Sequence, residues 1–202
     1  MGGDERALLP LLPADWTLQV FPWPVPHIKE SLSHYCQRPE AQALLQCDAL
    51  LGFSFGALPV LELQKVKPEL PVLLLACAIH QREINPWLRL LPLRGLLHLL
   101  PARFTHQMVI YWAKRFGKFG DRFDRFLQKI PATTYHWALQ QSLKARFQLP
   151  PNAYRLHGAQ DPLFPAARIQ PTELIAQGEH LLLSQQPKAV RQWLHKTLNS
   201  LP

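Results

Sequence analysis

The chain has 202 residues, of which 48% are hydrophobic, so it fits one globular domain and is not a disordered chain. Its formal net charge of +8 would suit nucleic acid, anionic lipid or an acidic substrate. However, the sequence contains no run of five Lys or Arg residues and no known nucleic-acid motif. We therefore expect a basic surface and no nucleic-acid partner.

The first part of the chain alternates between predicted helices and strands. In chain order we expect a helix at 5–12, a strand at 17–21 that prolines end, a helix at 28–46, a strand at 49–52, a helix at 57–65 and a strand at 72–76. The strand at 72–76 is apolar throughout, which is typical of a parallel strand buried on both faces.

Residues 82–147 differ from the rest. They are predicted to be mostly helical, with breaks at four prolines, and strands at 154–157 and 173–176 and a helix at 187–198 follow them. Strands that alternate with helices predict an α/β fold with a mostly parallel sheet. We expect residues 1–81 and 148–202 to form the core domain, and residues 82–147 to form a helical lid inserted after the third strand.

The three cysteines indicate no disulfide framework. Cys36, Cys47 and Cys77 are odd in number and lack paired or zinc-finger spacing, and Cys77 ends an apolar run that predicts a buried thiol. No basic segment followed by an apolar stretch opens the chain, and its apolar runs are shorter than the roughly 18 residues that span a bilayer. We expect a cytoplasmic protein; the sequence does not indicate its oligomeric state.

The segment Gly52-Phe53-Ser54-Phe55-Gly56 lies between a predicted strand and a predicted helix. A serine between two glycines at such a turn is the pattern of a nucleophile elbow. The serine must sit on a sharp turn with its Oγ exposed, and we expect side chains two residues before and after it to collide. The pattern therefore makes Ser54 a candidate nucleophile.

Two candidate partners of this serine follow later strands. Asp161 comes after the strand at 154–157, and His180 comes after the strand at 173–176 with Gly178 allowing a tight turn. Open α/β sheets build their sites in loops at the carboxyl ends of strands. A serine nucleophile needs a base, and the base needs an acid that orients it. The remaining histidines share no ligand spacing, so no metal site is predicted.

With the elbow, the segment His157-Gly-x-x-Asp161 and the Gly178-x-His180 loop in this order, the chain resembles the α/β-hydrolase fold superfamily. More narrowly, it resembles small bacterial α/β hydrolases of unassigned substrate. Gly2-Gly3-Asp4-Glu5-Arg6 matches their opening glycine loop, and Arg82-Glu83-Ile84-Asn85-Pro86 matches more loosely the stretch that opens their lid. The resemblance covers nearly the whole chain and is weakest at 103–148.

The resemblance implies a serine hydrolase that cleaves an ester, thioester or related acyl bond in a small molecule without a cofactor. Ser54 would be the nucleophile, His180 the general base and then acid, and Asp161 its orienting partner. The backbone N–H groups of Phe55 and Gly3 would form the oxyanion hole.

The start of the chain departs from this family. The opening loop of the family follows a central strand that lies between the strands matching 17–21 and 49–52, and this chain begins at the loop. We expect an N-terminally truncated sheet without that strand, unless the two flanking strands meet directly. Loss of the strand would weaken the oxyanion hole, which favours an alternative function as a non-catalytic binding protein of the same fold.

Aromatic residues between 111 and 126 recur at helical spacing, and lysines and arginines flank them. We interpret this stretch as a lid helix with solvated cations. The alternative is contact with a membrane surface through residues 107–130.

Overall fold

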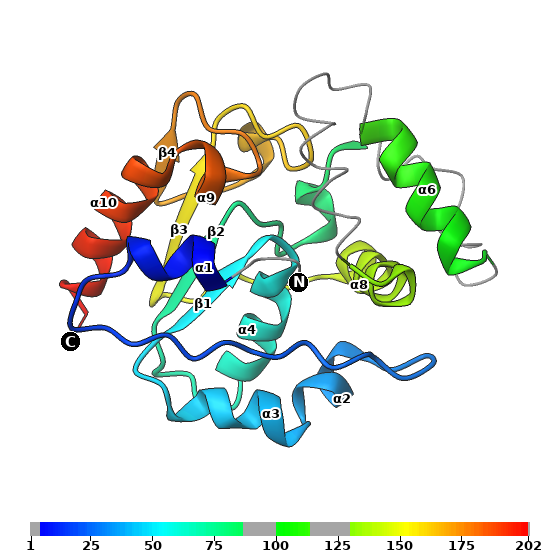
Figure 1. Cartoon of the computed structure of the whole chain (residues 1–202), viewed down its shortest axis with the longest axis horizontal. Helices are drawn as coiled ribbons and strands as arrows, with labels where there is room; N and C mark the ends of the chain where they lie inside the picture. The colour runs from blue at the N-terminus through cyan, green and yellow to red at the C-terminus, as the bar shows by residue number, and fades with distance from the viewer. Residues whose placement is uncertain (1–4, 87–99, 114–129, 202) are drawn as a thin grey trace.

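The computed structural model describes residues 5–86, 100–113 and 130–201. In this part of the chain four parallel strands form one sheet in sequence order: β1 (Leu50–Phe53), β2 (Val72–Leu75), β3 (Ala153–Gly158) and β4 (Glu173–Ile175) (Figure 1). Each strand pairs in parallel with the next. Four of the five predicted strands are thereby confirmed to within two residues, and so is the α/β fold class.

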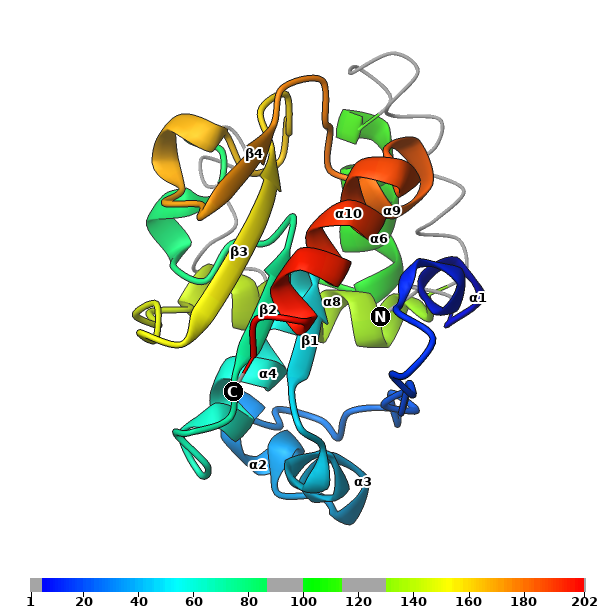
Figure 2. The same cartoon turned by 90° about the vertical axis from the view of Figure 1, so that its left-hand side faces the viewer.

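Helices cover both faces of the sheet. Figures 1 and 2 place α10 (Pro187–Leu198), α9 (Leu182–Gln185) and α1 (Glu5–Leu8) on one face. The other face carries α2 (Leu32–Cys36), α3 (Pro39–Gln42) and α4 (Ala57–Gln64). Both helical layers pack against side chains of β2.

The side chains of β2 alternate between the two helical layers. Leu73 and Leu75 belong to the core beneath α10, whereas Val72 and Leu74 belong to the core beneath α4. All four side chains are fully buried. The prediction of a strand buried on both faces is therefore confirmed.

The remaining helices among the described residues are short or belong to the expected lid. They are α6 (Ala102–Ala113), α8 (Ala132–Lys144) and the 3-10 helices η1 (Leu9–Leu11), η2 (Ala43–Gln46), η3 (Ser54–Gly56), η4 (Gln81–Glu83) and η6 (Ala166–Arg168). Helices α6 and α8 pack against each other. No helix among the described residues is long and apolar enough to cross a bilayer. Most of the basic-aromatic stretch lies outside the described residues, so its interpretation stays a prediction.

The predicted helix at 28–46 is broken into α2, α3 and η2. It begins only after Ser31, whose side chain accepts a hydrogen bond from the His34 N–H and caps α2. It then breaks because Arg38, which precedes Pro39, is extended (ψ 146°). The helical periodicity of residues 28–46 shows neither the cap at Ser31 nor the break before Pro39, so the prediction of one long helix is wrong.

The predicted strand at 17–21 is wrong. These residues are in no strand or helix, and β1 pairs only with β2 in the described part of the chain. A cavity of about 740 Å³ separates this segment from β1, so neither can use the other as a hydrogen-bonding neighbour. For the same reason, the alternative that residues 17–21 and β1 pair directly with each other is also wrong.

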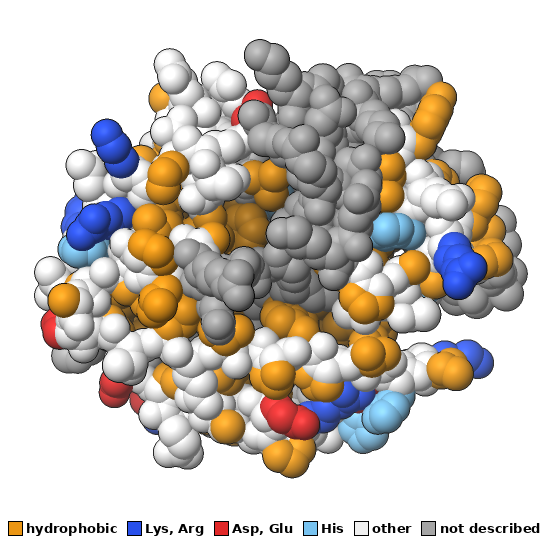
Figure 3. All heavy atoms as spheres, in the orientation of Figure 1, with side chains coloured by type: hydrophobic (Ala, Val, Ile, Leu, Met, Phe, Trp, Pro, Cys, Tyr) orange, Lys and Arg blue, Asp and Glu red, His pale blue; other side chains and the backbone are white. Residues whose placement is uncertain are grey.

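Figure 3 shows how the types of side chain are distributed over one face of the molecule. Hydrophobic side chains are spread over this face, and the Lys and Arg side chains lie scattered toward its margins. The cysteines are free: Cys36 and Cys77 are buried and Cys47 is partly exposed. The prediction for Cys77 is confirmed, and burial raises the pKa of its thiol to about 11.

A buried ion pair joins β3 to the loop that follows β2. Arg155, only 1% exposed, donates to both carboxylate oxygens of Glu83 at 2.9 and 2.7 Å and to the carbonyl of Cys77 at 2.7 Å. Glu83 also accepts the Ile79 N–H at 2.7 Å. The pair therefore fixes the point at which the chain leaves the sheet for the expected lid.

We predict that Glu83→Gln lowers the free energy of unfolding by about 3 kcal/mol, because the buried Arg155 charge loses its partner. Urea denaturation measures the change. The matched control is Glu173→Gln, which breaks the exposed pair with Lys196 and should cost less than about 1 kcal/mol. Equal losses in the two variants would contradict this account.

Candidate active site

Ser54 lies on the turn between β1 and α4. Its φ angle of 53° is in the left-handed region, which non-glycine residues seldom adopt. The turn continues as η3 and enters α4 at Ala57. The local geometry is therefore the strand–turn–helix arrangement expected of a nucleophile elbow.

The two glycines that flank this turn have different roles. A Cβ on Gly52 would lie 2.6 Å from the Cα of Ala57, so only glycine fits there. A Cβ on Gly56 would meet nothing closer than the Trp23 ring at 3.8 Å, an ordinary contact. The expectation of a steric need at both positions is correct for Gly52 and wrong for Gly56, where a Cβ would have room.

Asp161 follows β3 and is held by its own loop. Its Oδ1 accepts the backbone N–H groups of Leu163 at 2.8 Å and Phe164 at 3.0 Å. The side chain is nearly fully buried. These bonds fix the carboxyl group and leave Oδ2 to face another partner.

His180 lies between Asp161 and Ser54. Its Nδ1 is 2.8 Å from Asp161 Oδ2, and its Nε2 is 2.8 Å from Ser54 Oγ. Since a carboxylate only accepts hydrogen bonds, Nδ1 carries the proton and Nε2 is left to accept the Ser54 hydroxyl proton. The structure thus brings together all three residues that the sequence selected.

Two glycines allow the loops of Asp161 and His180 to approach each other. A Cβ on Gly178 would lie 2.6 Å from Leu182 and 3.0 Å from the Cα of Gly158. The Gln160 N–H donates to the Gly178 carbonyl at 2.8 Å across this contact. Both glycines are therefore needed for the close packing of the two loops, because a Cβ at either position would clash with the other loop.

Aromatic rings enclose the imidazole of His180. The Phe164 ring lies edge-on to it with a centroid distance of 5.0 Å, and the Phe53 ring lies at 5.8 Å. The side chain is only 1% exposed. Its hydrogen bonds with Asp161 and Ser54 therefore operate largely out of contact with water, where electrostatic interactions are stronger.

His157 is a buried neighbour of Asp161, and its place at a strand end before Gly158 predicts a structural role. Its Nε2 donates to the Phe164 carbonyl at 2.8 Å and lies 3.5 Å from Asp161 Oδ2. Burial lowers the pKa of His157 despite the nearby Asp161 carboxylate. These contacts agree with the structural role expected for His157 at the end of its strand.

The expected oxyanion hole is only partly within the described residues. The Phe55 N–H donates to no other described residue, so this donor is available, whereas Gly3 lies outside the described part of the chain. Among the described residues, no group of three His, Cys, Asp or Glu side chains is arranged to hold a metal ion.

Comparison with solved structures identifies the fold. A hydrolase from Pseudomonas aeruginosa PA01 aligns with a TM-score of 0.56 and 14% identity over 84% of this chain and 72% of its own. The meta-cleavage product hydrolase CumD from Pseudomonas fluorescens IP01 aligns with a TM-score of 0.54 and 12% identity over 94% of this chain and 75% of its own. The chain has the α/β-hydrolase fold. No protein-family model and no curated protein matches the sequence.

The two elbow glycines of this α/β-hydrolase fold provide a matched test. Gly52→Ala should lower the free energy of unfolding by about 1–3 kcal/mol, because its methyl group would overlap the backbone of α4. Gly56→Ala should change it by less than about 0.5 kcal/mol, since its methyl group has room. Thermal or urea unfolding distinguishes them, and the reverse order would show that the elbow is built differently.

The buried His157 predicts a pH dependence of stability. Folding lowers the pKa of His157, so below its unfolded pKa of about 6.5 the unfolded chain binds a proton more readily than the folded protein does. The free energy of unfolding therefore falls as the pH falls below about 6.5. His157→Gln should therefore lose less unfolding free energy than the parent protein between about pH 7 and about pH 5. Urea titrations at the two pH values measure this, with His34→Gln as the control for an exposed histidine. An unchanged pH dependence in His157→Gln would contradict the assignment.

Proposed function

We propose that this chain is a serine hydrolase that cleaves an ester, thioester or related acyl bond through a covalent acyl-enzyme. The hydrogen-bonded series Ser54 Oγ, His180 Nε2, His180 Nδ1, Asp161 Oδ2, with 2.8 Å at both bonds, carries the proposal. The hydrolases with which the chain shares its fold support hydrolysis as the reaction class.

In the first half of the reaction, Ser54 Oγ attacks the carbonyl carbon of the substrate while His180 Nε2 takes the hydroxyl proton. The carbonyl oxygen becomes an oxyanion, for which we propose the N–H groups of Phe55 and Gly3 as donors. Collapse breaks the bond to the leaving alcohol or thiol, which takes the proton from His180. Ser54 then carries the acyl group.

In the second half, water replaces the leaving group. His180 accepts a proton from water, the hydroxide attacks the acyl carbonyl, and the carboxylic acid departs as Ser54 recovers its proton. Asp161 keeps the Nδ1 proton in place and stabilises the imidazolium in both halves. His157 acts one step further out, since its bond to the Phe164 carbonyl fixes the loop whose N–H groups hold Asp161.

The surroundings favour a small substrate with an apolar or aromatic acyl group. Beside Ser54, the ring of Phe55 lies 5.5 Å from Trp137 of α8 and 5.9 Å from Trp23. Phe53 and Phe164 lie on the histidine side. Aromatic side chains beside the nucleophile contact apolar groups more favourably than charged ones.

We predict that Ser54→Ala lowers the turnover of short p-nitrophenyl esters by at least about 10⁴-fold and abolishes labelling by a fluorophosphonate probe. Ser142→Ala is the matched control, because the Ser142 hydroxyl donates to the Ala138 carbonyl within α8 and to no other described residue. Both variants should unfold at the temperature of the parent protein.

Turnover in Ser54→Ala within about ten-fold of the parent protein would remove Ser54 from the mechanism. If the folded parent protein neither hydrolyses the esters nor reacts with the probe, the result would favour the non-catalytic binding protein instead. Circular dichroism before each assay keeps this outcome apart from misfolding.

A further inference from the structure

Phe55 immediately follows the candidate nucleophile, and its ring is in contact with two tryptophans. The Trp137 ring of α8 meets it edge-on, with a centroid distance of 5.5 Å and an interplanar angle of 76°. The Trp23 ring lies 5.9 Å from it. Aromatic pairs of this kind are favourable beyond the area that they bury. Both contacts therefore restrict where the Phe55 side chain can lie.

Trp137 is held in place by hydrogen bonding as well as by packing. The residue is only 5% exposed, and its Nε1–H donates to the backbone carbonyl of Glu30 at 2.7 Å. Gln141, one turn further along α8, donates to the same carbonyl at 3.3 Å. The Tyr35 ring packs against the indole with a centroid distance of 4.6 Å. A buried indole whose N–H has an acceptor keeps a fixed orientation.

The carbonyl that accepts this bond belongs to a residue that is itself fixed. The buried carboxylate of Glu30 accepts the Arg38 guanidinium at 3.2 and 2.6 Å and the His27 N–H at 2.7 Å. The Glu30 N–H donates in turn to the His27 carbonyl at 3.1 Å. These bonds close the loop at 27–30 and pair the buried charge. Trp137 is thus tied to a segment that lies outside the expected lid.

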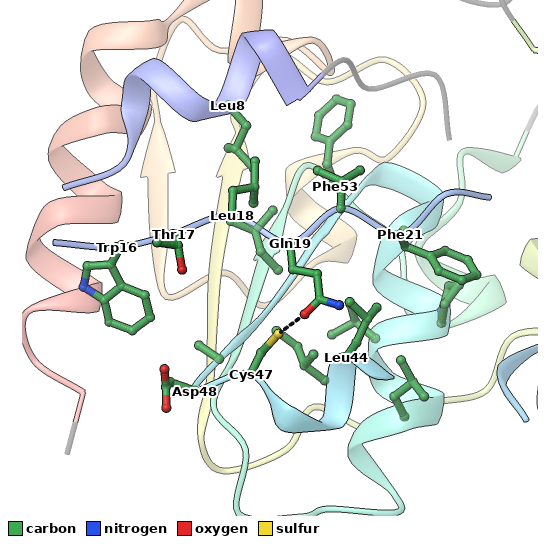
Figure 4. A pocket seen from close by; sticks show the side chains of 18 of the residues that line it. Leu8, Trp16, Thr17, Leu18, Gln19, Phe21, Leu44, Cys47, Asp48 and Phe53 are labelled. Carbon is green, nitrogen blue, oxygen red and sulfur yellow. Dashed lines mark hydrogen bonds between the residues drawn. The ribbon is translucent and has the colours of Figure 1, made fainter. Parts of the chain in front are cut away.

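Trp23 is supported by the same neighbours. The Tyr35 hydroxyl donates to the Pro24 carbonyl at 2.8 Å, which fixes the backbone next to Trp23. The ring of Phe21, which lines the cavity beside β1 (Figure 4), lies 5.1 Å from Trp23 and 5.7 Å from Tyr35. Trp23 has a φ angle of 53°, which a residue with a side chain holds only where its surroundings impose it.

A fixed Phe55 side chain matters because we propose the Phe55 N–H as an oxyanion donor. Such a donor is effective only if it points at the position where the oxyanion forms. Ser54, with its φ angle of 53°, holds the preceding peptide in a sparsely populated conformation. Relaxation of this turn would rotate the Phe55 N–H, and contacts that hold the Phe55 ring oppose that rotation.

We propose that Trp137 is a positioning residue for the reaction: by holding the Phe55 ring, it keeps the Phe55 N–H directed at the oxyanion. This inference rests on the serine hydrolase mechanism proposed above. It gives α8 a role beyond covering the site, because a helix of the expected lid then supports the turn that carries Ser54.

The test compares two buried tryptophans from the cores on opposite faces of the sheet. Trp137→Leu should lower kcat for p-nitrophenyl acetate at least ten-fold and change KM by less than about three-fold, since the lost interaction acts in the transition state. Trp193→Leu, at a 3% exposed position of α10, is the matched control. It should lose comparable stability in urea and keep kcat within about three-fold. A raised KM with unchanged kcat in Trp137→Leu would assign Trp137 to substrate contact alone and overturn the proposal.

A second variant separates the ring from its hydrogen bond. Trp137→Phe keeps an aromatic ring beside Phe55 but cannot donate to the Glu30 carbonyl, so its kcat should lie between those of the parent and Trp137→Leu. Phenylboronic acid, whose boron adds the Ser54 oxygen to give a tetrahedral adduct, should bind more weakly in step with kcat across the three proteins. Equal boronate affinity in the three proteins would overturn the proposal.

A measurement that needs no turnover separates this inference from the proposed function. The order parameter of the Phe55 amide, from nitrogen relaxation, should be about 0.85 in the parent and below about 0.6 in Trp137→Leu, and Trp193→Leu should match the parent. One value in all three proteins would overturn the role of Trp137 whether or not the chain cleaves esters. If the value falls as expected while the folded parent neither cleaves esters nor binds the boronate, the proposed function fails and the restraint of Phe55 by Trp137 stands.

Discussion

Parallel pairing of the four strands is the constraint on which the candidate site depends. It brings the carboxyl ends of β1, β3 and β4 to one edge of the sheet, so the turn of Ser54 and the loops of Asp161 and His180 converge there. Residues 126 positions apart in the chain come within hydrogen-bonding distance for this reason. The fully buried side chains of β2 hold that edge in place from both faces.

Precision at the site comes from the loops rather than the strands. The Gly158–Gly178 contact sets the separation of the two loops, and the N–H groups of Leu163 and Phe164 fix the carboxyl group that orients His180. His157 and the Arg155–Glu83 pair stabilise the same region from beneath. The site is therefore supported by buried polar groups whose bonds are mostly local to the ends of β2 and β3.

The sequence predicted what depends on apolar patterning and on glycine position. It gave the four paired strands, the order of the site residues and the steric need for Gly52. It missed what depends on a neighbour in space: residues 17–21 have strand composition but no pairing strand among the described residues. The structural role of His157 was expected, but the partner of its ring, the Phe164 carbonyl, follows only from the fold. The cavity next to β1 lies where the sequence led us to expect that a central strand is missing.

The most direct test of the central claim is to locate the acyl group on the protein. The folded chain would be mixed with p-nitrophenyl acetate, quenched in acid within the first turnover, digested and analysed by tandem mass spectrometry. Our account predicts an acetyl group on Ser54, and its loss from this position in His180→Ala. Ester turnover with the acetyl group on another residue, or with no acetylated residue at all, would contradict the account.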